Sequence, residues 1–428
     1  MQAHHSTQSL YVPIDVGKNV HAFGAYVGPH LAPLIPSQAV VTRRCGYEQF
    51  TNWLAEHIAS QRYAPIIVGL EPTGVYHEPW AYALARDVGT QVSLQMVNPF
   101  RTRQKRRQLQ NRAEQKTDPI DVEALAHCLR DGLGRPFHLP NPELLALEIW
   151  CRDHYRLRHD QVQLTNRLRS ELDRLWPGAL VDVQAFTTAH PQLAVPEPLV
   201  RTQPLRRKLV QGILGIDPDP YTWQGMSRDQ IRTTLRGAGL RCGPKTAHKV
   251  WHIAHRAVLP PRAMAALLAA QVRADFQRYL HYQTQLAHLR AQAEALLRRS
   301  SGVVVATVPG ISDFLAARYV SVVADVHRFE HADQVWALVG FDIVQDDSGD
   351  RRRRGAITKR GQPYGRDVLY QLGFFTSRAC SVIRRAKLRA LRRGKSHIEA
   401  VIHAAHKANR MCFHLYKHGI PFDPAHAR

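Results

Sequence analysis

The order of apolar and amphipathic segments in the first 135 residues restricts the fold of this chain more than any other feature. Short apolar runs suited to buried strands alternate with helical patterns, such as the stripe formed by Phe50, Trp53, Leu54 and Ile58. The order is three strands, helix, strand, helix, strand and helix, which predicts an α/β domain over residues 8–135. The predicted strands are 9–16, 21–27, 38–43, 64–71 and 91–99, and the predicted helices between them are 46–60 and 76–87.

Four acidic residues stand where these segments end or begin. Asp15 and Glu71 close two of the predicted strands, and Asp118 and Asp121 lie in KTDPIDVEALA at the start of a helical pattern. Carboxylates gathered at one place repel one another unless a cation neutralises them, and Mg²⁺ is the usual cation beside phosphates. We therefore expect a Mg²⁺ site, which Mn²⁺ could also fill. Capping of a helix is the alternative for Asp118 and Asp121.

The composition is strongly basic, with 58 lysines and arginines against 35 acidic residues among 428, a net charge of +23. This excess suits a nucleic-acid backbone. No apolar stretch approaches the ~20 residues of a membrane-spanning helix, and the first residues show no secretory signal pattern. Six widely spaced cysteines, with no Cys-x-x-Cys pair, favour reduced thiols in a cytoplasmic protein over a disulfide or zinc framework.

Two long helical patterns lie within residues 143–300. Leucines recur from Leu157 to Leu175, and apolar residues from Tyr279 to Leu296 alternate steps of three and four, a heptad-type seam. Such helices pair as an antiparallel hairpin or join subunits. Between them, the proline-rich segment 176–261 is expected to be an irregular insertion with one helix, which starts at a capping box of Ser227 and Gln230.

Residues 301–420 are expected to form a basic, mainly helical module. Its stretch VPGISDFLAA resembles the hairpin of helix-hairpin-helix DNA-binding modules. In such a hairpin, Pro309 and Gly310 would turn the chain and leave backbone N–H groups free for a phosphate. A plain connection between two helices of a bundle explains the same residues nearly as well.

Ser348 lies in QDDSGDRRRRG, a polar stretch that follows an apolar segment. A Ser-Gly pair in a loop is usually only a turn. Here the hydroxyl stands beside guanidinium groups that bind phosphate, and a serine activated by a base or a metal attacks phosphate esters. The basic residues expected to bind nucleic acid in this stretch are Arg351, Arg352, Arg353, Arg354, Lys359 and Arg360.

With both ends of the chain considered, the sequence resembles the IS110-family transposases, the bridge-RNA-guided serine recombinases of insertion sequences. The resemblance covers about 8–135 and 301–415. The family's DEDD set matches Asp15 in IDVGK, Glu71 in LEPTG, and Asp118 and Asp121 in KTDPID. Its nucleophilic serine matches Ser348 in DDSGDRRRRGAITKRG. Departures from the pattern are the long insertion, Pro119 and Val122 in the DEDD helix, and a second hydroxyl, Thr358, in the serine loop.

The resemblance implies a fold, a chemistry and partners. The fold is α/β plus mainly α, with a RuvC-like (ribonuclease-H-like) N-terminal domain, a coiled-coil middle and a helix-hairpin-helix-containing C-terminal transposase domain. Mg²⁺ at the DEDD site would position the scissile phosphate, and Ser348 would attack it to give a covalent phosphoserine–DNA intermediate. The implied partners are donor and target DNA, a structured non-coding bridge RNA, and further copies of the chain in a dimer or tetramer, in the nucleoid of a bacterial cell.

Two other functions fit parts of the sequence. A RuvC-like metal-dependent nuclease or junction resolvase would use only the acidic site and would hydrolyse DNA with water, without a covalent intermediate. A non-catalytic nucleic-acid scaffold would depend on neither the acidic residues nor Ser348. Both explain the charge, but neither explains the acidic set and the Ser-Gly loop together.

Overall fold

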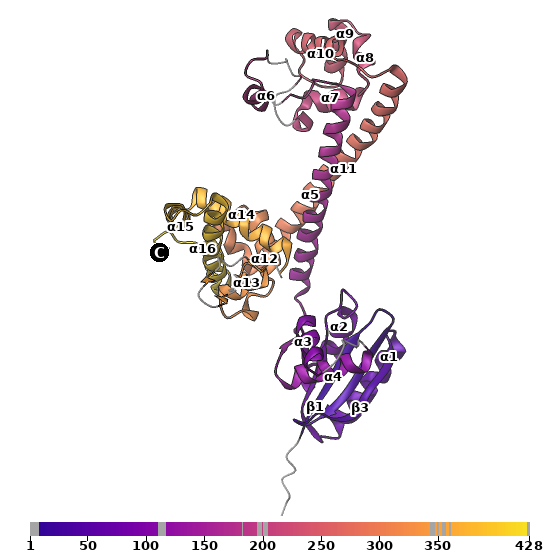
Figure 1. Ribbon diagram of the computed structural model, residues 1–428, viewed down its shortest axis with the longest axis vertical. Coiled ribbons are helices and arrows are strands. Elements are labelled where there is room, and N and C mark those ends of the chain that lie inside the picture. The colour runs from indigo at the N-terminus through magenta and orange to yellow at the C-terminus, as the bar shows by residue number, and fades with distance from the viewer. Residues whose placement is uncertain are drawn as a thin grey trace, which may run out of the picture. The chain divides into compact units, whose positions relative to one another are not determined.

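The computed structural model describes residues 8–109, 117–181, 183–194, 199, 204–342, 347–348, 351–352, 357–358 and 361–425. It divides into two compact units, Met1–Pro140 and Asn141–Arg428 (Figure 1). Each unit has hydrophobic cores of its own.

The first unit is built on a six-stranded sheet with the order β3-β2-β1-β4-β5-β6. β1 pairs antiparallel with β2 and parallel with β4, and β4 pairs parallel with β5. This mixed sheet is compatible with the expected RuvC-like domain. The strands are β1 Gln8–Val16, β2 Val20–Val27, β3 Ala32–Val41, β4 Tyr63–Leu70, β5 Ser93–Val97 and β6 Gly134–Pro136.

Helices pack on both faces of this sheet. The even-numbered residues of β1, among them Val12 and Ile14, share a core with α1 and α2, whereas Tyr11 shares a core with α4. Because successive strand residues point to opposite faces, Asp15 falls on the α4 face with Tyr11. The helices are α1 Arg44–Ala59, α2 Glu78–Asp87, η1 Gly89–Gln91, α3 Pro99–Leu109 and α4 Asp118–Arg130.

The predicted strands and helices of this unit are present, with two differences at the edges of the sheet. β3 begins at Ala32 rather than near residue 38. The sequence did not predict its first half because these residues are mostly exposed and lack the apolar alternation of a buried strand. The short β6, which pairs with β5, was not predicted. Its sequence is GRP, and glycine and proline are depleted in strands.

The second unit contains two long antiparallel helices, α5 (Pro142–Leu175) and α11 (Arg262–Arg299). Glu143 forms an ion pair with Arg299, and Arg167 forms one with Asp275 at 2.5 Å, so residue numbers fall along α11 as they rise along α5. Of the two alternatives for these helices, pairing as an antiparallel hairpin within one chain is therefore confirmed. α5 starts where the Asn141 side chain accepts from the Glu143 N–H at 2.8 Å.

The segment between these helices is more helical than its prolines indicated. Ser227 and Gln230 form the predicted capping box, but the expectation of an irregular segment with a single helix was wrong. Pro220 and Pro244 stand in the first turns of helices, where proline is favourable rather than disruptive. The elements are α6 Val183–Ala189, η2 Pro204–Arg206, α7 Lys208–Ile216, α8 Pro220–Gln224, α9 Arg228–Gly237 and α10 Pro244–Arg256.

These inserted helices form a small module with the adjoining ends of α5 and α11. Its core contains the fully buried Trp223, whose indole N–H donates to the Asp217 carbonyl at 2.7 Å. Leucines of the predicted α5 seam, Leu168 and Leu175 among them, belong to the same core. The module is therefore continuous with the helix pair.

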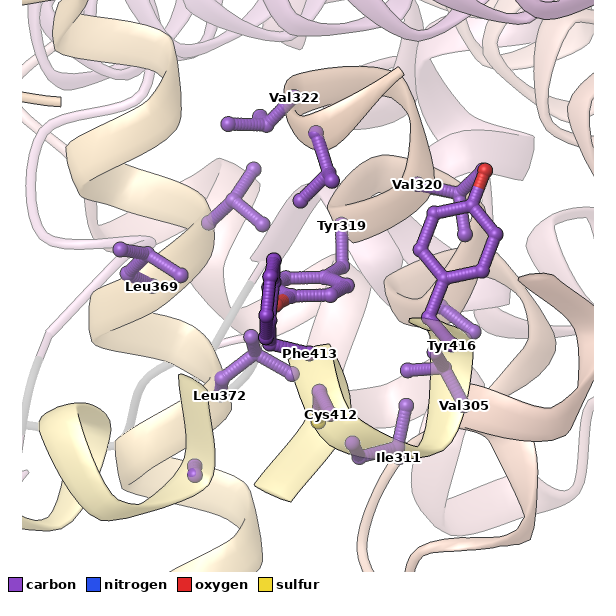
Figure 2. Packing of buried hydrophobic residues seen from close by; sticks show 14 of the residues in the cluster. Val305, Ile311, Tyr319, Val320, Val322, Leu369, Leu372, Cys412, Phe413 and Tyr416 are labelled. Atoms are coloured by element: carbon purple, nitrogen blue, oxygen red, sulfur yellow. The ribbon is translucent and has the colours of Figure 1, made fainter. Parts of the chain in front are cut away.

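The opposite ends of α5 and α11 pack against a C-terminal bundle. Figure 2 shows its centre, where the Tyr319 ring lies among Leu369, Leu372, Cys412 and Phe413. The buried Tyr319 hydroxyl donates to Asn409 Oδ1 at 3.0 Å. The elements are η3 Ser301–Thr307, α12 Asp313–Val323, η4 Val326–Arg328, α13 Ala332–Leu338, β7 Asp347–Ser348, β8 Arg351–Arg352, α14 Pro363–Ala379, α15 Ser381–Arg392 and α16 His397–His418.

The cysteines and the helix lengths bear on the expected thiols and on membrane insertion. All six cysteines are free thiols, and only Cys45 is exposed. Within the described parts of the chain, no helix has both the length and the apolar character that crossing a membrane requires.

The crossing of α14 and α16 predicts a large effect of one added methyl group. A Cβ on Gly373 would lie 2.5 Å from both the Ala405 nitrogen and the Val401 carbonyl oxygen. Gly373→Ala should therefore lower the free energy of unfolding by about 1–3 kcal/mol through overpacking. Gly215→Ala in α7 is the matched control, because a Cβ there meets nothing within 4 Å. It should be neutral or stabilise by up to about 1 kcal/mol. Guanidinium denaturation of both variants measures the difference, and equal effects would contradict the close packing.

Candidate active site

Asp15 and Glu71 occupy neighbouring positions at the carboxyl ends of β1 and β4. Ile14 pairs with Leu70 in the parallel ladder, and the Glu71 N–H donates to the Ile14 carbonyl at 3.4 Å. Ile67 packs on the α4 side of β4, so strand alternation directs Glu71 to the α4 face. Asp15 lies on the same face, and both residues are half-buried.

The turn after Asp15 is held by a buried histidine. The Gly17 N–H donates to His21 Nδ1 at 3.3 Å, and the imidazole packs edge-on against Trp80 at 4.7 Å between ring centroids. Burial lowers the pKa of His21 below its usual 6.5, which keeps the ring neutral and Nδ1 able to accept. Gly17 is required here, because a Cβ would lie 2.3 Å from the Val20 carbonyl oxygen.

Asp118 and Asp121 lie in the first turn of α4. The residue at the N-cap position is Thr117, so Asp118 is the first helical residue rather than the cap itself. Both carboxylates are placed where they complement the partial positive charge of the helix N-terminus. Asp118 is exposed, whereas Asp121 is only 6% exposed.

Asp121 forms a buried ion pair with Arg106 of α3. The guanidinium neutralises the carboxylate in a place where an uncompensated charge would be costly. A second ion pair joins Lys105 of α3 to Asp131, the residue that follows the last turn of α4, at 2.5 Å. The side of α4 that carries Asp121 is thus bound to the basic helix that precedes it in the sequence.

The four carboxylates share one face of the sheet but do not form a closed set of metal ligands in this arrangement. Among the described residues, no three His, Cys, Asp or Glu side chains are placed to hold a metal ion. Burial raises the pKa of the Cys128 thiol to about 11, and the negative charge of Glu71 contributes. A Cβ on Gly69, two residues before Glu71, would lie 2.4 Å from Leu129, so this end of β4 packs against the last turns of α4 rather than the first turn, which carries Asp118 and Asp121. The oxygen donors suit a hard divalent cation, but their present spacing does not.

Hydrogen bonds join the two ends of the segment between Val339 and Gly361, which carries Ser348. Arg366 donates from Nη1 to the carbonyls of Val339 at 2.9 Å and Gly361 at 2.8 Å, on the two sides of the segment. The Thr358 N–H donates to the Asp342 carbonyl at 2.8 Å. A Cβ on Gly361 would lie 2.2 Å from the Val339 carbonyl carbon, so only glycine permits this approach. The ends of the segment are therefore held together.

Inside this segment, Ser348 pairs with Arg351 and Asp347 with Arg352 across the antiparallel strands β7 and β8. The backbone of the candidate nucleophile thus lies opposite that of a candidate phosphate-binding arginine. The remaining basic residues singled out from the sequence, Arg353, Arg354, Lys359 and Arg360, lie outside the described residues. Ser348 belongs to the second unit and the carboxylates to the first.

Pro309 and Gly310 form the expected turn, between η3 and α12. Gly310 has φ +93°, and a Cβ would lie 2.8 Å from the Phe375 carbonyl oxygen of α14. The Ser312 hydroxyl caps α12 by accepting from the Leu315 N–H at 3.3 Å. The helix before the turn is a 3-10 helix, and the turn contacts the bundle on one side, so phosphate binding there stays a prediction.

Two residues of these sites were not anticipated from the sequence. Arg106 was one basic residue in the run FRTRQKRR, and only its spatial approach to Asp121 distinguishes it from its neighbours. Thr102 and Arg106 lie on a buried face of α3, and this burial results from tertiary packing, which the sequence pattern does not show. Arg366 had no sequence signal, because its partners are backbone carbonyls.

The ion pair between Arg106 and Asp121 predicts a specific stability effect. Arg106→Ala should destabilise the protein by about 3–5 kcal/mol, because it leaves a buried carboxylate uncompensated. Arg44→Ala is the control: its ion pair with Glu48 is surface-exposed and worth at most about 1 kcal/mol. Thermal unfolding of the two variants would measure the contrast. A loss for Arg106→Ala as small as that of the control would argue against the buried pair.

Two protein-family models match the chain. The DEDD transposase domain of the IS110 family matches residues 12–177, and the model described as transposase IS116/IS110/IS902 family matches residues 303–390. No curated protein matches the chain. The first match includes all four carboxylates, and the second includes Ser348 and the Pro309–Gly310 turn. The chain therefore belongs to the IS110 family of transposases, enzymes that act on DNA.

Proposed function

We propose that this transposase recombines insertion-sequence DNA through a covalent phosphoserine intermediate formed by Ser348. The observation that carries the proposal is the common placement of Asp15 and Glu71. They lie at the ends of two adjacent parallel strands, on the face of the sheet against which α4 packs, and α4 carries Asp118 and Asp121 in its first turn. This is how carboxylates from distant parts of a sequence are brought to one face for chemistry on phosphates.

The chemical step assigned to Ser348 is phosphoryl transfer. Its Oγ attacks the scissile phosphorus, a base takes up the hydroxyl proton, the bond to the 3′ oxygen breaks, and the departing 3′ oxygen takes up a proton. The products are a phosphoserine ester at one DNA end and a free 3′ hydroxyl at the other. Attack of a 3′ hydroxyl from the partner strand reverses the step, so the phosphodiester bond energy is conserved without ATP. Arg351 and Arg352, on the strand opposite Ser348, would neutralise the phosphate.

Within this proposal, Asp15, Glu71, Asp118 and Asp121 hold Mg²⁺, or Mn²⁺ in its place. When bound, the ion neutralises charge on the phosphate and helps to position it. For Asp121 to become a ligand, its carboxylate has to exchange Arg106 for the ion, and the first turn of α4 has to approach Glu71. Arg106 keeps the carboxylate neutralised until then.

The proposed partners are donor DNA, target DNA, a structured bridge RNA and further copies of the chain. The basic composition favours polyanionic partners, and selection of sequence by base pairing with an RNA follows from the family resemblance. The seam between α5 and α11 is closed within one chain. A dimer or tetramer built on these helices would therefore use their outer faces.

Substitution of Ser348 distinguishes recombination from hydrolysis. Ser348→Ala should abolish strand cleavage and the covalent protein–DNA adduct, because no nucleophile remains. Thr358→Ala, which removes the other hydroxyl of the segment, should retain both. The readout is denaturing electrophoresis of end-labelled DNA, with peptide mapping of the adduct. Cleavage by Ser348→Ala without an adduct would favour the metal-dependent nuclease.

The acidic set makes a separate prediction about metal binding. Asp15→Asn and Glu71→Gln should each weaken Mn²⁺ binding at least tenfold, because each removes one anionic oxygen ligand. Asp87→Asn is the control, since Asp87 is engaged by Arg86 and Tyr47 on another part of the unit. Isothermal titration calorimetry with Mn²⁺ reports this without DNA. Unchanged binding in both variants would remove these residues from the metal site.

A further inference from the structure

The inserted module presents a helix face that is rich in basic and aromatic side chains. α10 packs into the module core through Ala247, Val250, Ile253 and Ala254. At 100° per residue, Thr246 falls on this packed side, and the other residues fall on one outer arc, with Pro244 in the first turn. That arc carries Lys245, His248, Lys249, Trp251, His252, His255 and Arg256.

No acidic residue interrupts this arc, because α10 contains none. Across residues 176–261 there are eleven lysines and arginines against five acidic residues. Of those five, Asp219 caps α8, and Asp217 is bound to Thr222 and Arg273. Asp229 forms an ion pair with Arg232 at 3.4 Å. The acidic side chains described are thus engaged within the module.

The aromatic side chains of the arc are stacked on one another. Trp251 is half-buried, with part of its side chain against the module core, and its ring lies 4.1 Å from that of His255 at an angle of 28°. The Arg228 guanidinium, from α9, lies over the same indole at 4.5 Å from the ring centroid. The His255 imidazole and the Arg228 guanidinium, both planar, therefore already stack on this indole. A nucleobase can take the place of either, since stacking on an aromatic ring tolerates any base.

The α10 helix also lies outside the part of the chain that the family comparison describes. The two family models match residues 12–177 and 303–390, and α10 falls in the interval between them. A role for this face is therefore additional to the phosphoryl-transfer chemistry at the two ends of the chain.

We propose that the α10 face, defined as Arg228 together with the seven outer residues of α10, binds an unpaired nucleic-acid strand. Lys245, Lys249 and Arg256 contact successive phosphates, and Trp251 with its flanking imidazoles stacks bases. A duplex would offer phosphates but no free base faces, so the aromatic half of the surface favours unpaired nucleotides. Single-stranded DNA and an RNA loop share this chemistry.

The test uses the full-length chain and two probes, 30-nucleotide oligo(dT) and oligo(U), each with one photoreactive 4-thio base. Fluorescence anisotropy across a salt series gives affinity, and mass spectrometry maps the crosslinks. Lys245→Glu/Lys249→Glu should weaken binding about tenfold and reduce the slope of log K against log salt by roughly 1 to 1.5, for two lost phosphate contacts. Trp251→Leu should weaken binding about fivefold or more through lost stacking.

The matched control is Arg206→Glu/Lys208→Glu, which makes the same charge change at exposed positions of the same module. It should leave the slope within about half a unit of wild type, since no contact to these residues is proposed. Circular dichroism of each variant checks that the helices are intact. Binding and crosslinking are measured without strand cleavage, so this test is independent of the recombination mechanism.

One result of this experiment would support the proposal, and two others would overturn it. Crosslinks within 244–256, lost in the α10 variants and retained in the control, support the proposal, and the preferred probe identifies DNA or RNA as the source. Equal losses in the control would show a general charge effect and overturn it. Competition by a 30-base-pair duplex as strong as that by the single strand would overturn the requirement for unpaired bases.

Discussion

The second unit depends on the antiparallel contact between α5 and α11. One end of this pair contributes Leu147, Cys151, Ala293 and Leu297 to the C-terminal bundle core, and the other end contributes leucines to the inserted module. Its register is set by the buried Asp275, whose carboxylate accepts two hydrogen bonds from Arg167, at 2.5 and 2.7 Å. A slip of one residue would separate this carboxylate from its partner and expose apolar side chains in both cores. The helix pair therefore links the bundle that carries Ser348 to the module that carries the α10 face.

In the first unit the corresponding constraint is the packing of α4 across the sheet. Gly24 and Gly69 leave room for Val122 and Leu129 of α4, since a Cβ on either glycine would lie within 2.6 Å of those side chains. This packing brings the first turn of α4 to the face that bears Asp15 and Glu71. It also explains why the carboxylates do not yet converge, because Glu71 faces the later turns of the helix. In this arrangement Arg106 compensates Asp121, so the metal site proposed above requires the exchange of an arginine for a cation.

Sequence patterns predicted those elements whose stability is local. The strands β1, β2, β4 and β5 are rich in apolar residues, and the Ser227 capping box marks the start of α9. The patterns failed where neighbours decide the outcome. The first half of β3 is a strand because β2 supplies its hydrogen bonds, and the inserted helices α7 to α10 form because they share a core around Trp223. Proline content alone gave the wrong expectation there, since it does not say whether a proline starts a helix or interrupts one.

The sequence by itself determined the α/β character of the first unit, the two long helices, the family, and which acidic residues and which serine are candidates for chemistry. These follow from periodicity and short motifs, which depend on residues close together in the chain. Only the tertiary structure decided that α5 and α11 pair within one chain, that Asp121 is bound to Arg106, and that Arg366 closes the base of the Ser348 segment. It also gathered Arg228 and the outer residues of α10 on one surface. Each of these depends on contacts between residues distant in sequence or on which side of a helix is buried, and those follow from packing rather than from local pattern.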